Sequence, residues 1–332
     1  FPENDERRLA KDLATQLGLT YHDIEITEEE FLRDFDQLVY DMDDPVADIA
    51  AYGYSRVAEE ARTQGVKVLL AGFGGDELFW GYGWVRESVR QNLLKQTFVG
   101  KLRLFLETLF SAERYHLIHH PWTALKRSIQ KAWKKGYIFY ELTPGFRRTA
   151  AEQSSIFTNA FLQSVDEDLP WRLFRSYESK EPWLESCYLL NDLWLRSNCI
   201  ALGDRLSMAK SVELRLPLID YKLIETVFGL RKNLKTDYAQ GYKHWLLEAT
   251  RDLLPQEIAN RKKRGFEPPT ATWMSRLIDE RSKQLLEGSL VRLQIIDPEY
   301  LKNALAERKK YASFLYHCLL LETWINRYIE QD

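Results

Sequence analysis

The chain has 332 residues, of which 45% are hydrophobic and 29% are charged, and its formal net charge at pH 7 is -3. This composition is that of an ordinary globular protein, and it excludes a long disordered or low-complexity chain. The small net charge gives no whole-protein reason to expect a nucleic acid or an anionic membrane as the main partner. No apolar run reaches the roughly 18 residues that a membrane-spanning helix needs.

The three cysteines are Cys187, Cys199 and Cys318, and their odd number and wide spacing match neither a disulfide framework nor a zinc site. The first residues also lack the basic and then apolar stretches of a secretion signal. We therefore expect a cytoplasmic protein in a reducing compartment.

The first residues of the chain show helical periodicity. Apolar residues recur at helical spacing up to Leu17, and Gly18 then ends the pattern as a C-terminal cap, which predicts a helix over residues 4–17. Thr27 and Glu30 are spaced as a capping box, which predicts the start of a second helix that reaches about residue 42.

Two strands are expected in this part of the chain. Residues 21–26 carry isoleucine at alternate positions, and residues 66–71 form a short aliphatic run that suits a buried parallel strand. A helix over about residues 48–63 precedes the second strand. After residue 82 the strand signal disappears, and one helical pattern follows another. This order predicts an α/β layer with a parallel sheet, followed by a mostly α-helical portion.

Residues 95–148 are strongly basic, with eleven Lys or Arg residues and three acidic ones. Trp122, Trp133 and other aromatic side chains lie between the charges. The pattern favours a helical insertion with a solvated basic face and a small aromatic core. A patch that binds a polyanion is the alternative.

A glycine-rich loop follows the second strand, with glycine at Gly72, Gly74 and Gly75. Such a loop can turn its backbone N–H groups toward one point and bind a phosphate. Asp76 and Glu77 follow at once, and two adjacent carboxylates beside a phosphate suit Mg²⁺, a hard cation that takes oxygen ligands. The alternative is an ordinary turn from a strand into a helix, whose acidic residues interact favourably with the helix dipole.

Three segments together resemble the asparagine synthetase family: residues 70–82 (LAGFGGDELFWGY), residues 204–220 (DRLSMAKSVELRLPLID) and residues 261–273 (RKKRGFEPPTATW). Two shorter segments agree with the family in the same order, namely residues 43–45 (DDP) and residues 17–22 (LGLTYH). These five segments span nearly the whole chain.

The resemblance implies the C-terminal synthetase domain of that family. Its fold would be a truncated parallel-sheet domain of the pyrophosphatase-loop type, which binds adenine nucleotides, followed by a mostly helical portion. Residues 1–92 would be the α/β nucleotide-binding part, residues 93–175 the basic helical insertion, and residues 176–332 the helical part that completes the active site.

The resemblance also implies a reaction. The family transfers AMP from ATP to a small-molecule carboxylate and releases pyrophosphate, and an amine from glutamine or ammonia then displaces AMP to form an amide. ATP and Mg²⁺ are the implied cofactors. The implied site residues are Asp76 and Glu77 as catalytic metal ligands, Gly72, Phe73, Gly74, Gly75 and Lys263 around the nucleotide, Lys243 as the catalytic cation beside the acyl-adenylate, and Asp204 and Arg205 at the carboxylate substrate.

Glu213, Arg215 and Asp220 also match the family, and we expect them to form a buried ion-pair network. The chain departs from the family where the ATP-binding Ser-Gly-Gly-x-Asp-Ser loop would be, because that sequence is absent. We expect this loop, and a glutaminase domain, upstream of Phe1 in the native protein.

Phe73 is a further departure, because asparagine synthetases have an acidic residue at this position and the related β-lactam synthetase has a tyrosine. Phenylalanine can neither accept nor relay a proton. It either packs against the substrate, with the base supplied elsewhere, or marks a changed nucleophile or substrate.

Four functions remain open on the sequence. The first is an asparagine synthetase or a close relative, and the second is a specialised amide or lactam ligase acting on a peptide, a sugar or a natural-product carboxylate. The third is a non-catalytic scaffold derived from a synthetase domain. The fourth, a nucleic-acid enzyme that acts through the basic insertion, is the least favoured. A homodimer is also compatible with the sequence.

Overall fold

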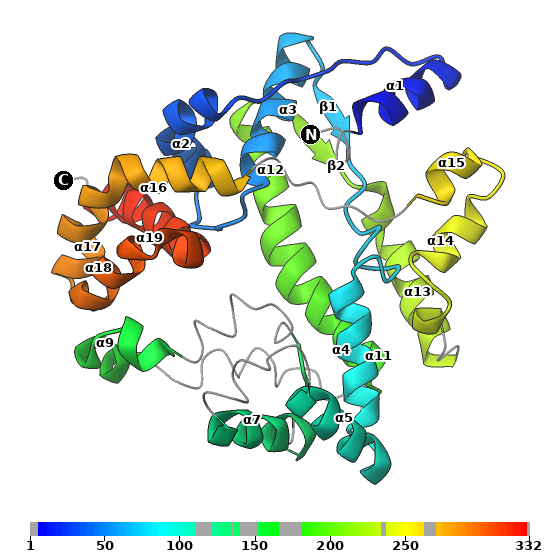
Figure 1. The fold of residues 1–332 in the computed structure, drawn as a ribbon. Helices are drawn as coiled ribbons and strands as arrows, with labels where there is room; N and C mark the ends of the chain where they lie inside the picture. Colours follow the sequence, from blue (N-terminus) through cyan, green and yellow to red (C-terminus); the bar gives the residue numbers. More distant parts are fainter. Residues whose placement is uncertain are drawn as a thin grey trace.

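The computed structural model describes residues 6–110, 121–133, 136–139, 152–165, 181–233, 237–261 and 270–330. Its first half contains α1 (Arg7–Gln16), α2 (Glu28–Met42), α3 (Ala51–Thr63), β1 (Val68–Leu70), α4 (Gly83–Leu94), α5 (Phe98–Phe110), α7 (Pro121–Trp133) and α9 (Asn159–Ser164). Helices make up most of both halves (Figure 1).

The second half begins with α11 (Pro182–Leu189), the π-helix η1 (Leu190–Ile200), α12 (Ala201–Ala209), β2 (Glu213–Arg215) and the 3-10 helix η2 (Pro217–Ile219). It continues with α13 (Tyr221–Asn233), the 3-10 helix η3 (Asp237–Ala239), α14 (His244–Ala249), α15 (Gln256–Ala259), α16 (Thr270–Glu287), α17 (Ser289–Arg292), α18 (Pro298–Ala306) and α19 (Arg308–Tyr328).

The helices predicted for the N-terminal part are confirmed. α1 ends at Gln16, and Gly18 has a φ of +67°, a conformation that glycine adopts without steric cost. α2 begins with the predicted capping box: the Thr27 hydroxyl accepts from the backbone N–H of Glu30, and the Glu30 carboxylate accepts from the backbone N–H of Thr27.

The described residues contain one parallel pair of strands, β1 and β2, in which Leu69 lies opposite Leu214. The strand predicted over residues 21–26 is wrong. That segment is irregular, and Ile26 packs against the main core instead of pairing with a neighbouring strand. β2 is an addition to the prediction, because three strand residues between helical segments are too few to give a period-2 pattern.

β1 is also less buried than expected. Leu70 is 71% exposed, and within the described residues β1 has a neighbouring strand on one edge only. Glu213 and Arg215 of β2 form an ion pair at 2.8 Å whose side chains are 56% and 60% exposed. Asp220 is exposed as well and accepts from the backbone N–H of Lys222. The prediction of a buried ion-pair network for these residues is therefore wrong.

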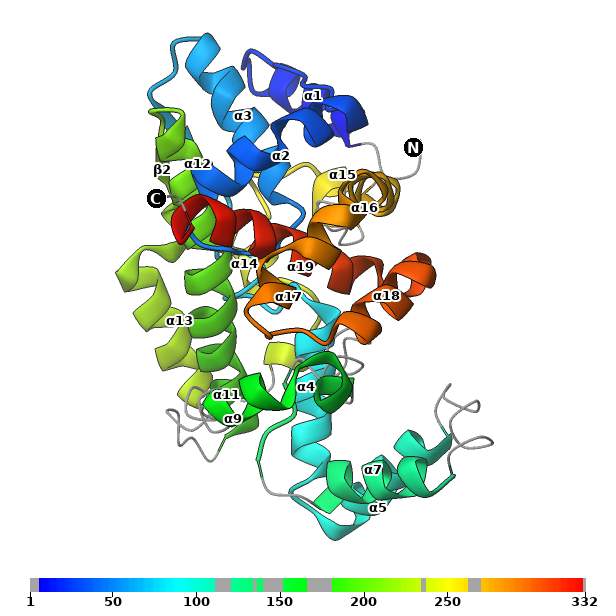
Figure 2. The same cartoon turned by 90° about the vertical axis from the view of Figure 1, so that its left-hand side faces the viewer.

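The main core joins α2 and α3 to the C-terminal helices α16 to α19 (Figure 2). Phe31 of α2 stacks on Trp273 of α16 with ring centroids 5.4 Å apart. Phe35 and Tyr316 meet edge to face at 6.2 Å. Because α12 packs on both α2 and α3, this core also supports the helix that leads toward the site.

α11, η1 and α12 form one continuous helical rod, since the backbone stays helical through both junctions. Its middle part, η1, is a π-helix of 11 residues. Most π-helical segments in proteins are single turns, and they are frequent at functional sites. The rod connects the main core at its α12 end with a second core at its α11 end. This second core consists of the buried residues Trp80, Val85, Val89, Phe139, Trp183, Leu184, Cys187, Leu189 and Leu190.

α5 and α7 pack against each other, and α5 also contacts α4. Phe105 and Trp133 meet edge to face between the two helices at 5.7 Å. Figure 2 shows this pair of helices projecting away from the rest of the molecule.

The domain boundaries at residues 92 and 175 stay a prediction. None of the described helices combines the length and apolar character needed to cross a membrane.

A buried ion pair lies beside the second core. Arg231 of α13 is fully buried, and its Nε lies 2.9 Å from Oδ2 of Asp237 in η3. The same oxygen accepts a hydrogen bond from the indole N–H of Trp80 at 2.7 Å. The Arg231 guanidinium lies over the Trp80 ring at 4.4 Å and donates to the carbonyl oxygen of Leu78. The pair therefore fixes the turn that contains Leu78 and Trp80.

Replacing Asp237 by asparagine should lower the free energy of unfolding by about 3–5 kcal/mol, because the Arg231 charge would stay buried without its counter-ion. Urea unfolding followed by tryptophan fluorescence measures the change. Glu213→Gln is the matched control, since it removes one charge from an exposed pair and should leave stability nearly unchanged. Equal losses in the two variants would contradict the role given to the buried pair.

Candidate functional site

The glycine-rich loop, residues 72–82, connects β1 to α4 (Figure 1). Gly74 has a φ of +93°, and its backbone N–H donates to Oε2 of Glu77 at 2.9 Å. A Cβ at Gly74 would overlap the Ile219 side chain and lie 3.1 Å from the carbonyl oxygen of Leu218. Glycine is therefore required here by the backbone conformation and by the close approach of the η2 segment.

Glu77 is buried inside the loop, with 3% of its surface exposed. Its Oε1 accepts from the Tyr82 hydroxyl at 2.6 Å, and its Oε2 accepts from the backbone N–H of Gly74. The Trp194 indole N–H donates to the Tyr82 oxygen at 3.3 Å, and the Cys199 Sγ lies 3.9 Å from Oε1. Glu77 thus links the two ends of the loop and holds them against η1.

Burial raises the pKa of Tyr82, and the neighbouring Glu77 carboxylate raises it further. The hydroxyl therefore stays protonated and remains a hydrogen-bond donor to Glu77 at physiological pH.

Asp76 is more exposed than Glu77, at 19%, and its Oδ1 lies 2.9 Å from Nζ of Lys243. The backbone N–H of Gly81 donates to the Asp76 carbonyl oxygen at 2.8 Å. A Cβ at Gly81 would overlap the Asp76 carboxylate. Gly81 therefore leaves the space in which the Asp76 side chain folds back over the turn toward Lys243.

Lys243 stands just before α14, with a left-handed φ of +52°, so it lies at the N-terminal end of that helix and not within it. Its backbone N–H donates to the Phe79 carbonyl oxygen at 2.8 Å. A backbone hydrogen bond and an ion pair thus attach Lys243 to the loop. Two of the residues predicted to be catalytic, Asp76 and Lys243, are in direct contact.

Phe73 packs against α3 and α12. Its ring meets Tyr54 edge to face, with centroids 5.5 Å apart. A Cβ at Gly203 would lie 2.6 Å from the Phe73 ring, so the glycine allows the close contact. Burial raises the pKa of Tyr54, which keeps its hydroxyl neutral. The apolar side chain at position 73 therefore joins the loop to α12.

Asp204 and Arg205, predicted to bind the substrate, follow Gly203 on α12. The Arg205 guanidinium lies 2.6 Å from Oδ2 of Asp44 and 3.8 Å from Oδ2 of Asp43. The tertiary structure thus joins two segments that the sequence identifies separately, residues 43–45 and residues 204–220. The Asp204 side chain is exposed.

Lys263 lies outside the described residues, so its role at the phosphates stays a prediction. Among the residues that the structure describes, no group of three His, Cys, Asp or Glu side chains forms a metal centre. The Mg²⁺ role of Asp76 and Glu77 also stays a prediction. Of the two carboxylates, Asp76 fits a shared ion better, because both oxygens of the buried Glu77 already accept hydrogen bonds.

Nothing in the local sequence pattern indicates that Trp194, Cys199, Arg231 and Asp237 belong to this region. They reach the loop only because η1, α13 and η3 pack beside it. The positive φ of Trp80, +59°, is likewise invisible in the sequence, since a bulky side chain at that conformation is uncommon.

All three thiols are free and buried. Burial raises the pKa of Cys187 to about 11, although the nearby Arg231 charge opposes this. Burial also raises the pKa of Cys199 and of Cys318. A protonated thiol is a poor nucleophile, so none of the three is suited to nucleophilic catalysis at neutral pH.

A family model described as asparagine synthase matches residues 1–326. The chain is 27% identical over 292 residues to the glutamine-hydrolyzing asparagine synthetase 1 of Bacillus subtilis, a match that covers 85% of this chain and 43% of that protein. It is 26% identical over 308 residues to the amidase chyE of Penicillium rubens, which covers 85% of this chain and 44% of that protein. The chain spans less than half the length of these relatives.

Gly81→Ala should lower the free energy of unfolding by about 1–3 kcal/mol, because the new Cβ must displace the Asp76 side chain. Gly229→Ala in α13 is the matched control. Nothing lies within 4 Å of its added Cβ, and alanine should stabilise this helix by about 0.5–1 kcal/mol. Urea unfolding measures both changes, and a Gly81→Ala protein as stable as the parent would contradict the packing described here.

Cys187 should make stability fall as the pH rises from 9 to about 11. Its thiol ionises at a pKa near 9.0 in the unfolded chain and near 11 in the folded one, so the stabilisation is complete below pH 9 and is lost through pH 11. Free energies of unfolding measured across this range should fall less steeply for Cys187→Ala than for the parent. Parallel curves would contradict the burial of this thiol.

Proposed function

This chain belongs to the asparagine synthase family, and from that premise we propose that it forms amide bonds with ATP through an acyl-adenylate, as an asparagine synthetase or a close relative. The observation that supports this most is the 2.9 Å contact between Asp76 and Lys243. The contact brings together an acidic residue of the glycine-rich loop and a cation from a distant segment. The buried hydrogen bonds of Glu77 hold that loop in one conformation. Glutamine or ammonia is the proposed nitrogen donor. The proposed location of the protein is the cytoplasm.

In the proposed reaction, Lys243 stabilises the negative charge that develops on the acyl group as the amine attacks. Asp76 is the proposed metal ligand, and Gly72, Gly75 and Lys263 bind the phosphates. When bound, Mg²⁺ would neutralise the departing pyrophosphate. Glu77 has a different task, because its two hydrogen bonds hold the loop in shape.

The pairing of Asp76 with Lys243 suits this division of roles. In the ligand-free arrangement each charge compensates the other, which limits the cost of holding both in a partly buried site. Asp204 and Arg205 are the proposed contacts for the carboxylate substrate and its amino group. Arg205 now contacts Asp44, and a substrate carboxylate could take the place of that aspartate.

A specialised amide ligase is the second candidate. Phe73 favours it, because its ring packs on Tyr54 and Gly203 and offers no proton acceptor to an amine nucleophile. Incubation of the native gene product with aspartate, ATP and ammonia separates the two candidates, since only the first predicts asparagine.

Substrate-dependent exchange between ATP and pyrophosphate tests the reaction class in the native gene product. Asp76→Ala should lower the exchange rate at least about 100-fold, because the metal loses its carboxylate. Lys243→Met should lower amide formation more than exchange, because Lys243 acts on the second step. Lys222→Met, an exposed lysine on α13, is the control and should change neither rate.

Full exchange by Asp76→Ala would rule out the metal role. A parent protein that catalyses no exchange with any of the carboxylates tested would favour the scaffold over either enzyme.

A further inference from the structure

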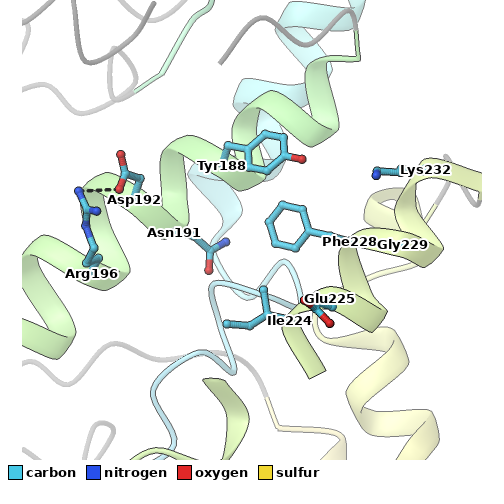
Figure 3. Close-up of a pocket in the computed structure, with 9 residues that line it drawn as sticks. All are labelled: Tyr188, Asn191, Asp192, Arg196, Ile224, Glu225, Phe228, Gly229 and Lys232. Atoms are coloured by element: carbon cyan, nitrogen blue, oxygen red, sulfur yellow. Dashed lines mark ion pairs between the residues drawn. The ribbon is translucent and has the colours of Figure 1, made fainter. Parts of the chain in front are cut away.

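A cavity of about 580 Å³ lies between the rod formed by α11 and η1 and the neighbouring helix α13 (Figure 3). Its volume is within the range of about 300–1,000 Å³ that is usual for small-molecule sites. Neither Asp76 nor Lys243 lines it, so it is separate from the site described above. It shares α13 with that site, because Phe228 lines the cavity and also packs against the core under Leu78 and Phe79.

Part of the cavity wall is aromatic. Tyr188 of α11 and Phe228 of α13 pack directly against each other, with ring centroids 5.0 Å apart and planes tilted by 32°, and both line the cavity. Ile224 lies one helical turn before Phe228 on the same wall (Figure 3). These side chains offer an apolar surface suited to an aromatic or large aliphatic group.

The charges of the cavity are not all compensated. Asp192 and Arg196 of η1 form an ion pair at 2.7 Å and neutralise each other. Glu225 and Lys232 of α13 are exposed, and the side chain of neither forms a hydrogen bond or an ion pair with any described residue. They are two helical turns apart, about 10 Å along the axis, and so lie on the same face of α13. Phe228 lies between them along the helix.

One polar side chain on the opposite wall can accept a further hydrogen bond. Asn191 donates from Nδ2 to the Cys187 carbonyl oxygen at 2.8 Å, which fixes the orientation of the amide. Asn191 lines the cavity, and its Oδ1 accepts no hydrogen bond from the described residues. An amide oxygen and a nearby carboxylate together can bind an ammonium group.

We propose that this cavity binds a zwitterionic amino acid with an aromatic or large apolar side chain. Lys232 binds the carboxylate, and Glu225 with Asn191 binds the ammonium group. The side chain of the ligand lies against Tyr188 and Phe228. The flexible side chains of lysine and glutamate close the remaining distance to the ligand charges.

Isothermal titration of the protein with L-phenylalanine tests this site. Lys232→Met should weaken L-phenylalanine binding about tenfold or more, because one charge-assisted contact is lost. The same variant should bind L-phenylalaninamide as the parent does, because that probe has no carboxylate. Glu225→Gln should weaken L-phenylalanine binding similarly and leave the binding of N-acetyl-L-phenylalanine, which lacks the ammonium group, unchanged.

Lys222→Met, on the same helix outside the cavity, is the matched control and should bind all three probes like the parent. Both test residues are exposed, so the variants should fold, and circular dichroism checks this. Equal affinity of the parent and both test variants for L-phenylalanine would overturn the proposal. So would the absence of binding by the parent at millimolar concentrations.

Discussion

The geometry of the loop depends on the buried contact between Arg231 and Asp237. Trp80 has a left-handed φ of +59°, which costs a bulky residue about 1–3 kcal/mol. Its indole N–H donates to Asp237, and its ring lies under the Arg231 guanidinium. Arg231 also donates to the Leu78 carbonyl oxygen. A buried ion pair adds little net stability over an apolar replacement, so we assign it mainly to selecting one conformation of the turn.

That conformation gives two adjacent carboxylates different surroundings. Glu77 points inward and is satisfied by the Gly74 N–H and the Tyr82 hydroxyl, so its charge is tolerated in a buried position. Asp76 lies in the space left by Gly81 and contacts Lys243. The first carboxylate stabilises the loop, and the second is partly exposed and paired with a cation.

Both cations predicted from the sequence and described by the structure are paired with an aspartate, Lys243 with Asp76 and Arg205 with Asp44. These pairs keep the charges compensated and hold the side chains in position. Phosphate and carboxylate groups of a ligand are oxyanions, as the aspartate side chain is, so they can accept hydrogen bonds from the same cations. Phe73 packs on Gly203, next to Asp204, and thereby couples the loop to the helix that carries Arg205.

The N-terminal helices, the glycine-rich loop after β1 and the family could all be predicted from the sequence, because caps, helical periods and motifs are read from local spacing. The strand predicted over residues 21–26 is wrong because a strand also needs a partner, which spacing does not reveal. The pairing of β1 with β2, the burial of Glu77, the contact of Asp76 with Lys243 and the packing of Phe73 on Gly203 became apparent only in the folded molecule. Each of these contacts joins segments far apart in the chain, and no local pattern records which distant segment will pack against which.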